Sequence, residues 1–262
     1  MTAFALRVMG SFAVAGVWIG AATLLAERYG SKIGGLVGNL PSTVVVSFIF
    51  ITLTQGLSFT TRAAQAVPVG MAIDTGFMLL FVLAARVNLA AAVAASLSGW
   101  FLMAFGVSRL GLPGWQVGSL LCVGSSLLVF LIMDKGLKLR THNARRTTYS
   151  ALQIVARMIF AGTVVAVSVI VASFAGPYWT GLFSTFPAVM MSTLVILYLV
   201  QGRAFSSATA KILTLSAPNI LAFALVASFA YPRVGLLAGT LAGYVAAALV
   251  VLALRPLVAM VS

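Results

Sequence analysis

Apolar stretches of about 20 residues, separated only by short polar or Gly/Pro-rich breaks, follow one another along the whole chain. A helix of that length spans the hydrocarbon core of a bilayer, where the backbone must satisfy its own hydrogen bonds. Hydrophobic residues make up 62% of the 262 residues and charged residues only 7%. The apolar stretches also lack the strict alternation of a transmembrane β-barrel. We therefore expect an all-α membrane protein.

Cutting the chain at its charged and Gly/Pro-rich breaks predicts about nine transmembrane helices. The first is longer than a signal-peptide core, and Glu27 and Arg28 follow it instead of a small-residue cleavage site, so we expect it to be retained. The expected spans are 4–25, 33–55, 66–85, 89–107, 115–133, 151–174, 179–201, 212–230 and 234–254.

Lys and Arg outnumber Asp and Glu by 16 to 3, which gives a net charge of +13. Cytoplasmic loops of membrane proteins gather Lys and Arg during insertion, so we interpret this charge as topological and expect no nucleic-acid partner. The nine spans place most basic residues on one side and three on the other. The richer side holds Arg28, Lys32, Arg86, Lys135, Lys138, Arg140, Arg145, Arg146, Arg203, Lys211 and Arg255, and the poorer side Arg62, Arg109 and Arg233. We predict a multi-pass protein of the cytoplasmic (inner) membrane, with its N-terminus outside and its C-terminus in the cytoplasm.

The chain also repeats itself. Gly35-Leu36, Pro41 and Gln55-Gly56 recur 146 residues later as Gly181-Leu182, Pro187 and Gln201-Gly202. This internal duplication predicts two four-helix repeats, residues 1–109 and 150–262. Residues 110–149 between them form a linking helix and a basic cytoplasmic loop. Because one helix separates the repeats, the second must enter the membrane from the opposite face, which is the inverted-repeat arrangement of many secondary transporters.

The pattern Gly-Leu-x-x-x-x-Pro, followed by an apolar run that ends in Gln-Gly, resembles the GlpM family of small inner-membrane proteins. The resemblance rests on Gly35, Leu36, Pro41 and Gln55-Gly56 and on the matching residues of the second repeat. It covers about half of each repeat. It implies a small inner-membrane unit present here in duplicate, and it implies no substrate.

Each repeated proline follows a Gly-rich segment and precedes a short apolar helix. Such a helix is too short to cross the bilayer alone, so the segment before it is expected to enter the membrane as a loop or as a short broken helix. Free N–H groups and the partial positive charge of a helix start bind anions. The alternative is a proline in an ordinary first turn, with glycines for close helix packing. The candidate substrate-binding residues at the two helix starts are Asn39, Pro41, Ser42 and Thr43, and Ser184, Thr185 and Pro187.

Arg7 and Arg157 complete the candidate substrate site, since both lie inside expected helices and occupy similar places in the two repeats. A buried intramembrane charge costs at least ~2.5 kcal/mol without a partner, which favours a functional role. The alternative is that the long side chains reach the headgroups from near the helix ends.

Asp74 is the only acid expected in the apolar interior, and Asn219 occupies nearly the same place in the second repeat. Burial favours the neutral form of a carboxyl group, so Asp74 could carry a proton or bind a cation, with Asn219 as its counterpart at the coupling site. A structural ion pair of Asp74 with Arg7 or Arg62 is the alternative.

Other features favour structural roles. Glycines spaced by four residues predict close helix crossings, and aromatic residues near span ends predict an interfacial belt. The glycines are Gly16 and Gly20, and Gly235, Gly239 and Gly243, the latter mirrored in the first repeat by Asn88, Ala92 and Ser96; the belt residues are Trp100, Trp115, Tyr178, Trp179 and Tyr231. A single cysteine, Cys122, and a single histidine, His142, predict neither a disulfide framework nor a metal site.

The residues favour transport over catalysis. Hydrolytic or phosphoryl-transfer chemistry usually needs paired carboxylates, a His cluster or an activated nucleophile, and no Walker motif is present. We therefore predict no enzyme activity and no cofactor. The expected function is alternating-access transport or exchange of a small anionic or zwitterionic solute, with proton coupling through Asp74. A lipid-phosphate carrier or flippase, and a membrane scaffold subunit, are the alternatives; lipids and a homo-oligomer fit all three.

Overall fold

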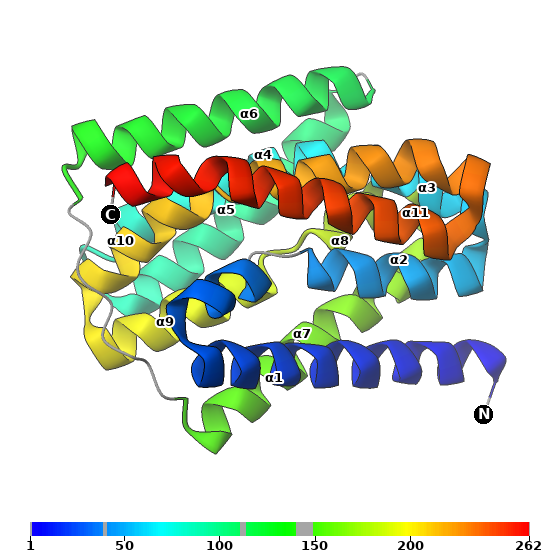
Figure 1. The fold of residues 1–262 in the computed structure, drawn as a ribbon, viewed down its shortest axis with the longest axis horizontal. Coiled ribbons are helices and arrows are strands. Elements are labelled where there is room, and N and C mark those ends of the chain that lie inside the picture. The colour runs from blue at the N-terminus through cyan, green and yellow to red at the C-terminus, as the bar shows by residue number, and fades with distance from the viewer. Residues whose placement is uncertain (1, 39–40, 111–113, 140–148, 262) are drawn as a thin grey trace.

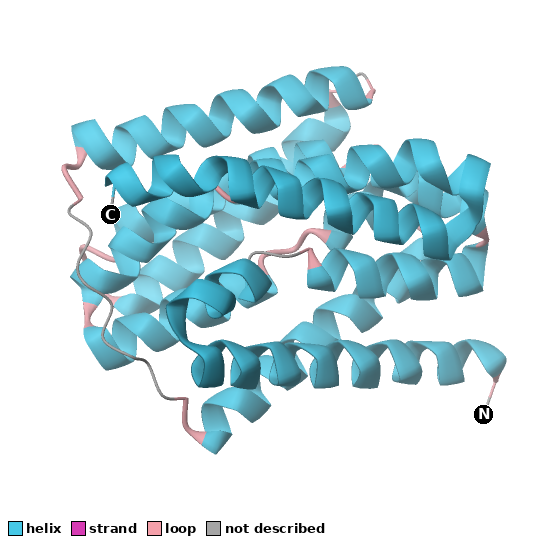
Figure 2. Cartoon of the chain, in the orientation of Figure 1, coloured by secondary structure: helices cyan, strands magenta, loops and turns pink. Residues whose placement is uncertain are grey.

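The structure, a computed structural model, describes residues 2–38, 41–110, 114–139 and 149–261, and every regular element in them is a helix (Figure 2). The elements are α1 (Ala3–Gly38), α2 (Ser42–Gln55), α3 (Leu57–Ala64), α4 (Val67–Ala84), α5 (Leu89–Arg109), α6 (Trp115–Leu131), the π-helix η1 (Ile132–Gly136), α7 (Ala151–Ala172), α8 (Gly176–Ser184), α9 (Ala188–Gln201), α10 (Arg203–Thr214) and α11 (Ala217–Val261).

Seven helical stretches of the described chain are long and apolar enough to cross a membrane. The expected spans at α4, α5, α6 and α7 agree with the structure to within a few residues. The last two expected spans differ, because residues 212–214 belong to α10 and a new helix begins at Ala217. Helix α11 then turns back on itself at Gly235, where φ is 80° (Figure 1). Gly235 therefore lies at the turn between two helical segments and is not part of a packing stripe.

Two short helices, α3 and α10, occupy segments that the sequence analysis leaves as loops. Each begins directly after a glycine in an extended left-handed conformation, Gly56 (φ 85°, ψ 165°) and Gly202 (φ 87°, ψ 170°). Residues with side chains rarely adopt this conformation, so the Gln-Gly pair ends one helix and reorients the chain for the next. Both helices contain too few apolar residues to resemble a span.

The first helix, α1, continues beyond its expected end at residue 25 and reaches Gly38. Figure 1 shows its last part turning back toward the start of α2. Gly34, Gly35 and Gly38 therefore lie in helix, so the loop, one of the two forms expected for this segment, is not observed. Asn39 lies outside the described residues.

Helices α1 and α7 cross closely where small residues let their backbones approach. A Cβ at Gly162 of α7 would lie 2.6 Å from the carbonyl oxygen of Phe12, and one at Gly16 of α1 would lie 3.1 Å from that of Met158. The predicted role of Gly16 in close helix crossing is confirmed by this contact. The crossing joins the N-terminal half of the chain to the C-terminal half.

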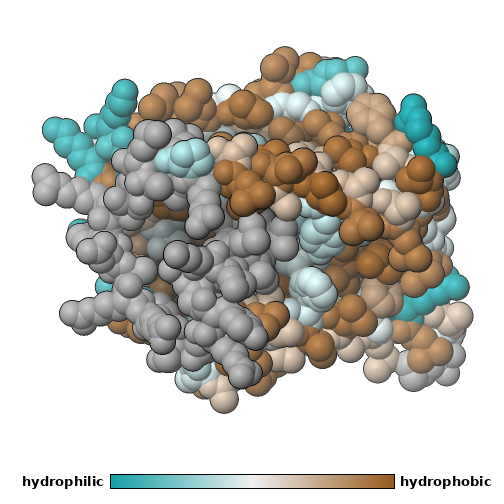
Figure 3. Space-filling view, in the orientation of Figure 1, coloured by the Kyte–Doolittle hydropathy of each residue, from teal (hydrophilic) through white to brown (hydrophobic). Residues whose placement is uncertain are grey.

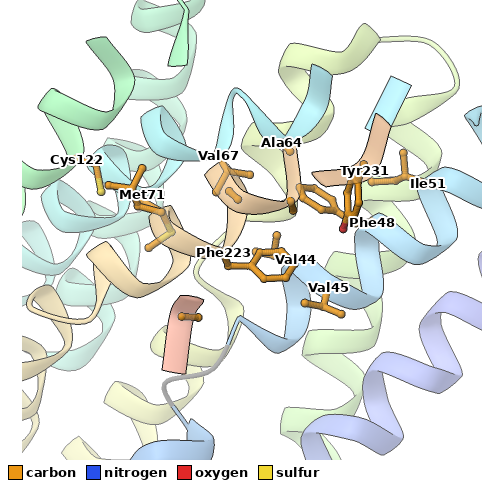
Figure 4. Packing of buried hydrophobic residues seen from close by; sticks show 14 of the residues in the cluster. Val44, Val45, Phe48, Ile51, Ala64, Val67, Met71, Cys122, Phe223 and Tyr231 are labelled. Carbon is orange, nitrogen blue, oxygen red and sulfur yellow. The ribbon is translucent and has the colours of Figure 1, made fainter. Parts of the chain in front are cut away.

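Two apolar clusters also join the halves. In the first, Phe48 of α2 packs against Phe223 and Tyr231 of α11, with ring centroids 6.2 and 6.4 Å apart (Figure 4). In the second, residues of α8, α9 and α10 pack against α4, α5 and α6. Tyr231 is buried in the first cluster, so the prediction that it belongs to an interfacial belt is wrong.

The surface of the described chain carries many large exposed hydrophobic side chains. Figure 3 shows hydrophobic residues over the middle of the drawn face and hydrophilic residues toward its two ends. The chain junctions at Arg86 and Arg203 share one end, because Arg203 Nη1 donates to Arg86 O at 3.4 Å. Trp115 packs on Phe229 near the α11 bend, at 5.3 Å. An apolar middle with hydrophilic residues toward the two ends is compatible with a multi-pass membrane protein.

Candidate functional site

The chain of the second half is interrupted between α8 and α9. The N–H groups of Thr185 and Phe186 bond to the carbonyls of Leu182 and Phe183, both at 3.1 Å, and Pro187 then has a ψ of 46° before α9 begins. Proline lacks an N–H and disfavours helical backbone in the residue before it, which accounts for the interruption. The break lies where the sequence predicts it, and Gly181 belongs to the short helix α8, which is one of the two forms expected for this segment.

The first half has the same backbone conformation at Pro41. Its φ and ψ are −74° and 48°, against −77° and 46° at Pro187. Each proline is followed by a helix of 14 residues, and the two helices end at Gly56 and Gly202 with nearly equal dihedral angles. From proline to glycine, two segments 146 residues apart therefore have one local structure.

The hydroxyl groups beside the second break already donate to their own helix. Ser184 Oγ donates to Gly181 O at 2.7 Å, and Thr185 Oγ1 donates to Leu182 O at 2.8 Å. Both side chains are buried. At the first helix start, Ser42 is buried and Thr43 half-buried. In this structure Ser184 and Thr185 have no hydroxyl hydrogen left for an anion, so helix-start N–H groups are the better donors.

The second break lies against helices of the first half. A Cβ on Gly70 of α4 would overlap the Thr185 hydroxyl, and a Cβ on Gly181 of α8 would overlap the carbonyl oxygen of Ala63 at the end of α3. Glycine at both positions removes the side chain that would hold these helices apart. The break is thus part of the interface between the halves.

Asp74 lies one helical turn beyond Gly70 on α4 and is 0% exposed. Its Oδ1 accepts a hydrogen bond from Trp100 Nε1 of α5 at 2.8 Å, and its Oδ2 has no hydrogen-bond partner in the described structure. Among the described residues, no Lys, Arg or His nitrogen lies within 4.0 Å of the carboxylate. The alternative of an ion pair with Arg7 or Arg62 is therefore not observed.

Trp100 connects this carboxyl to the break. The indole is 0% exposed, and its ring packs edge-on against Phe183 of α8 at 5.7 Å and Phe186 of the break at 4.9 Å. The prediction that Trp100 belongs to an interfacial belt is wrong. Trp100 is the twelfth of the 19 residues in its expected span 89–107, so its place in the sequence already favoured a position inside the membrane.

Arg157 of α7 contacts α9, the helix that follows the break. It is 7% exposed, its Nη1 donates to Thr193 Oγ1 of α9 at 2.9 Å, and its guanidinium carbon lies 5.4 Å from the centre of the Tyr149 ring. Its Nε has no hydrogen-bond partner, and no carboxylate oxygen of the described residues lies within 4.0 Å. Three residues further along α7, Phe160 packs on Phe186 at 6.4 Å.

Two other predicted site residues lie apart from this arrangement. Arg7 is exposed on α1, so it does not match the buried Arg157. Asn219 is the third residue of α11, just after Pro218, whereas Asp74 is the eighth residue of α4, where Pro68 is the second. Aligning the two prolines places Asp74 opposite Ala224. Asn219 is buried near the start of its helix and is not the counterpart of Asp74.

One ion pair with a buried lysine escaped the sequence analysis. Lys211 of α10 donates to Asp134 Oδ1 of η1 at 3.1 Å and to Leu139 O at 2.8 Å. The sequence places Lys211 in a cytoplasmic loop, but it is buried in a helix. Asp134, an acid at the end of an apolar run, was the available signal that a basic partner is needed.

Comparisons with protein-family models, with curated proteins and with solved structures find no match for this chain.

Proposed function

We propose that this protein is a secondary transporter that moves a small anionic or zwitterionic solute by alternating access. The observation that carries the proposal is the matched pair of helix starts at Pro41 and Pro187, with the same backbone in both halves. Interrupted helices at corresponding positions of two repeats are typical of carriers, which bind solute at the repeat interface near the membrane midplane.

The arrangement of the helices supports this proposal. In Figure 1, α2 runs from the centre of the molecule toward one end and α9 from the centre toward the other. Each has 14 residues, about 21 Å of helix, which is less than a ~30 Å hydrocarbon core. Both helices therefore begin inside the membrane. Inverted repeats produce such opposed helix starts.

The charges beside the second break favour an anionic group on the solute. Arg157 brings a positive charge that no described carboxylate neutralises, and the start of α9 adds a partial positive charge. The unbonded Nε of Arg157 leaves part of its planar donor edge available for a carboxylate or phosphate.

Solute binding by Arg157 is testable with Arg7 as its matched control. We would measure the thermal stabilisation of purified wild type, Arg157→Gln and Arg7→Gln by inorganic phosphate, succinate, glycine, spermidine and a polyprenyl phosphate. A ligand that binds the folded state raises its apparent stability. We expect a soluble anion or zwitterion to stabilise wild type and Arg7→Gln. Its affinity for Arg157→Gln should fall about 10-fold or more, because a charge-assisted hydrogen bond contributes about 1.5–3 kcal/mol.

The same solute should then exchange across proteoliposomes that contain wild type and not across those with Arg157→Gln. Stabilisation by the polyprenyl phosphate alone would replace this proposal with a lipid-phosphate carrier. If no probe stabilises the wild type and none crosses the membrane, the scaffold alternative takes the lead.

A further inference from the structure

The carboxyl group of Asp74 is held at one oxygen and left without a partner at the other. Oδ1 accepts from Trp100 Nε1 at 2.8 Å, whereas Oδ2 is buried with no hydrogen bond in the described structure. A charged carboxylate with a single donor is costly in an apolar interior, and a neutral carboxyl needs only a proton on Oδ2 to avoid that cost. The geometry therefore favours a proton on the orphan oxygen.

Among the described residues, the helices packed against α4 offer the Asp74 carboxylate no ion-pair partner. On α6, the titratable side chain is the buried thiol of Cys122, which carries no charge in its thiol form. On α10, Lys211 is already paired with Asp134. On α8, the titratable side chain is Tyr178, whose hydroxyl has no partner in the described structure. On α11, Tyr231 shares a hydrogen bond with Thr240. On α5, Arg109 lies over the Phe105 ring. A proton from solution is the simplest way to neutralise the carboxylate.

The break between α8 and α9 packs on both the Asp74 helix and the residue that holds its carboxyl. Trp100 donates to Asp74 while its ring contacts Phe183 and Phe186. One turn before Asp74, the Thr185 side chain packs against Gly70, in the space that a Cβ would fill. A movement of the break would therefore shift Trp100 and, with it, the hydrogen bond to Asp74 Oδ1.

We infer that Asp74 binds and releases one proton and that Trp100 links the protonation state of this carboxyl to the position of the α8–α9 break. Binding adds one proton from water to Oδ2 and turns a carboxylate into a carboxylic acid, and release reverses the step with no other bond changed. The inference rests on the proposed function in one respect: it makes the proton the coupling ion of the solute site beside it.

The test follows Trp100 in the absence of any solute. In a protein whose Trp18, Trp115 and Trp179 are replaced by Phe, the fluorescence of Trp100 reports the charge on its hydrogen-bond acceptor. We expect its emission to pass through one transition as buffer changes from acidic to alkaline, and we expect Asp74→Asn to abolish that transition, because the amide keeps an acceptor oxygen and cannot titrate. An emission that is independent of pH in the parent, or a transition that persists in Asp74→Asn, overturns the inference.

A second measurement covers a failure of Asp74→Asn to fold. Infrared difference spectra of wild type, recorded between acidic and alkaline buffer, should contain the carbonyl stretches of the carboxyl groups that titrate, and Trp100→Phe should shift the Asp74 stretch because the hydrogen bond to Oδ1 is lost. If Trp100→Phe shifts none of these bands, the inference is overturned.

These outcomes are separate from those of the transport assay. Titration of Asp74 in a protein that moves no solute leaves the proton site and removes the proposed function. Solute exchange in a protein whose Asp74 does not titrate leaves the transporter and removes the proton as its coupling ion.

Discussion

At the scale of single residues, the ion pair between Lys211 and Asp134 has unequal partners. The Lys211 side chain is 2% exposed and that of Asp134 is 32% exposed. Removing Asp134 leaves a buried ammonium whose remaining described acceptor is Leu139 O, whereas removing Lys211 leaves a carboxylate that water reaches. The energetic cost of breaking this pair should therefore depend on which side is removed.

We expect Asp134→Ala to lower the free energy of unfolding by about 3 kcal/mol and Lys211→Met to lower it by less, because Met fills the space of the Lys stem without a charge. Thermal unfolding of both variants and of the double variant measures the difference. The double variant should be more stable than Asp134→Ala. A larger loss for Lys211→Met would mean that the Leu139 hydrogen bond, and not the buried charge, decides the stability of this contact.

At the scale of helices, Gly56 and Gly202 hold the same conformation after two helices of equal length. A Cβ at either position would meet nothing within 4 Å, so a substitution there tests backbone conformation alone. We expect Gly56→Ala and Gly202→Ala each to cost about 1–3 kcal/mol of stability, since φ near +85° with extended ψ is nearly exclusive to glycine.

The control for these two variants is Gly106→Ala on α5, where the backbone is helical and the space is also open. This change should leave the melting temperature unchanged or raise it, because Ala favours helix. Equal losses of stability in Gly56→Ala and Gly202→Ala would support equivalent elements in the two halves. If both variants melt at the same temperature as Gly106→Ala, the two turns do not require glycine.

At the scale of the whole molecule, the α1–α7 crossing is a direct contact between the halves. A Cβ on Gly162 would lie 2.6 Å from the backbone oxygen of Phe12, so Gly162→Ala must push the two helices apart. We expect a loss of about 1–3 kcal/mol. In the same helix pair, a Cβ on Gly20 would meet the flexible sulfur end of Met158, at 2.7 Å, so Gly20→Ala should cost less. Unfolding of the two variants in the same detergent compares them, and the opposite order would show that the halves are not held by this backbone contact.

The orientation in the membrane is a second prediction at this scale. The distribution of Lys and Arg predicts that the C-terminus lies in the cytoplasm. Lys211 is buried and ion-paired, so its role in stability explains its presence and it is left out of the count of loop charges. The remaining Lys and Arg residues of the loops still lie mostly on one side. A C-terminal reporter that is active only in the cytoplasm should therefore be active in this fusion. Activity of a periplasmic reporter at the same site would reverse the topology.

What the sequence determined by itself is the part that depends on local chemistry. Long apolar runs specify helices, because lipid offers the backbone no other hydrogen-bond partner. Pro187 marks an interruption of the helix, because proline has no N–H to donate and disfavours helical backbone in the residue before it. The Gln-Gly pairs mark turns. The recurrence of these signals 146 residues apart correctly predicted that Pro41 and Pro187 begin similar short helices. The amphipathic helices α3 and α10 escaped because their polar residues resemble a loop.

Tertiary structure alone decided which polar residues meet. In a membrane, side chains that face lipid and side chains that face the core are both apolar, so hydropathy does not distinguish the two faces of a span. Arg7 and Arg157 are similar in sequence context, but only Arg157 lies against another helix and is buried. In the same way, the hydrogen bond from Trp100 to Asp74 joins residues 26 positions apart on two different helices. That bond depends on how α4 and α5 pack together, and this packing results from the shapes of both helices and not from the pattern of either one.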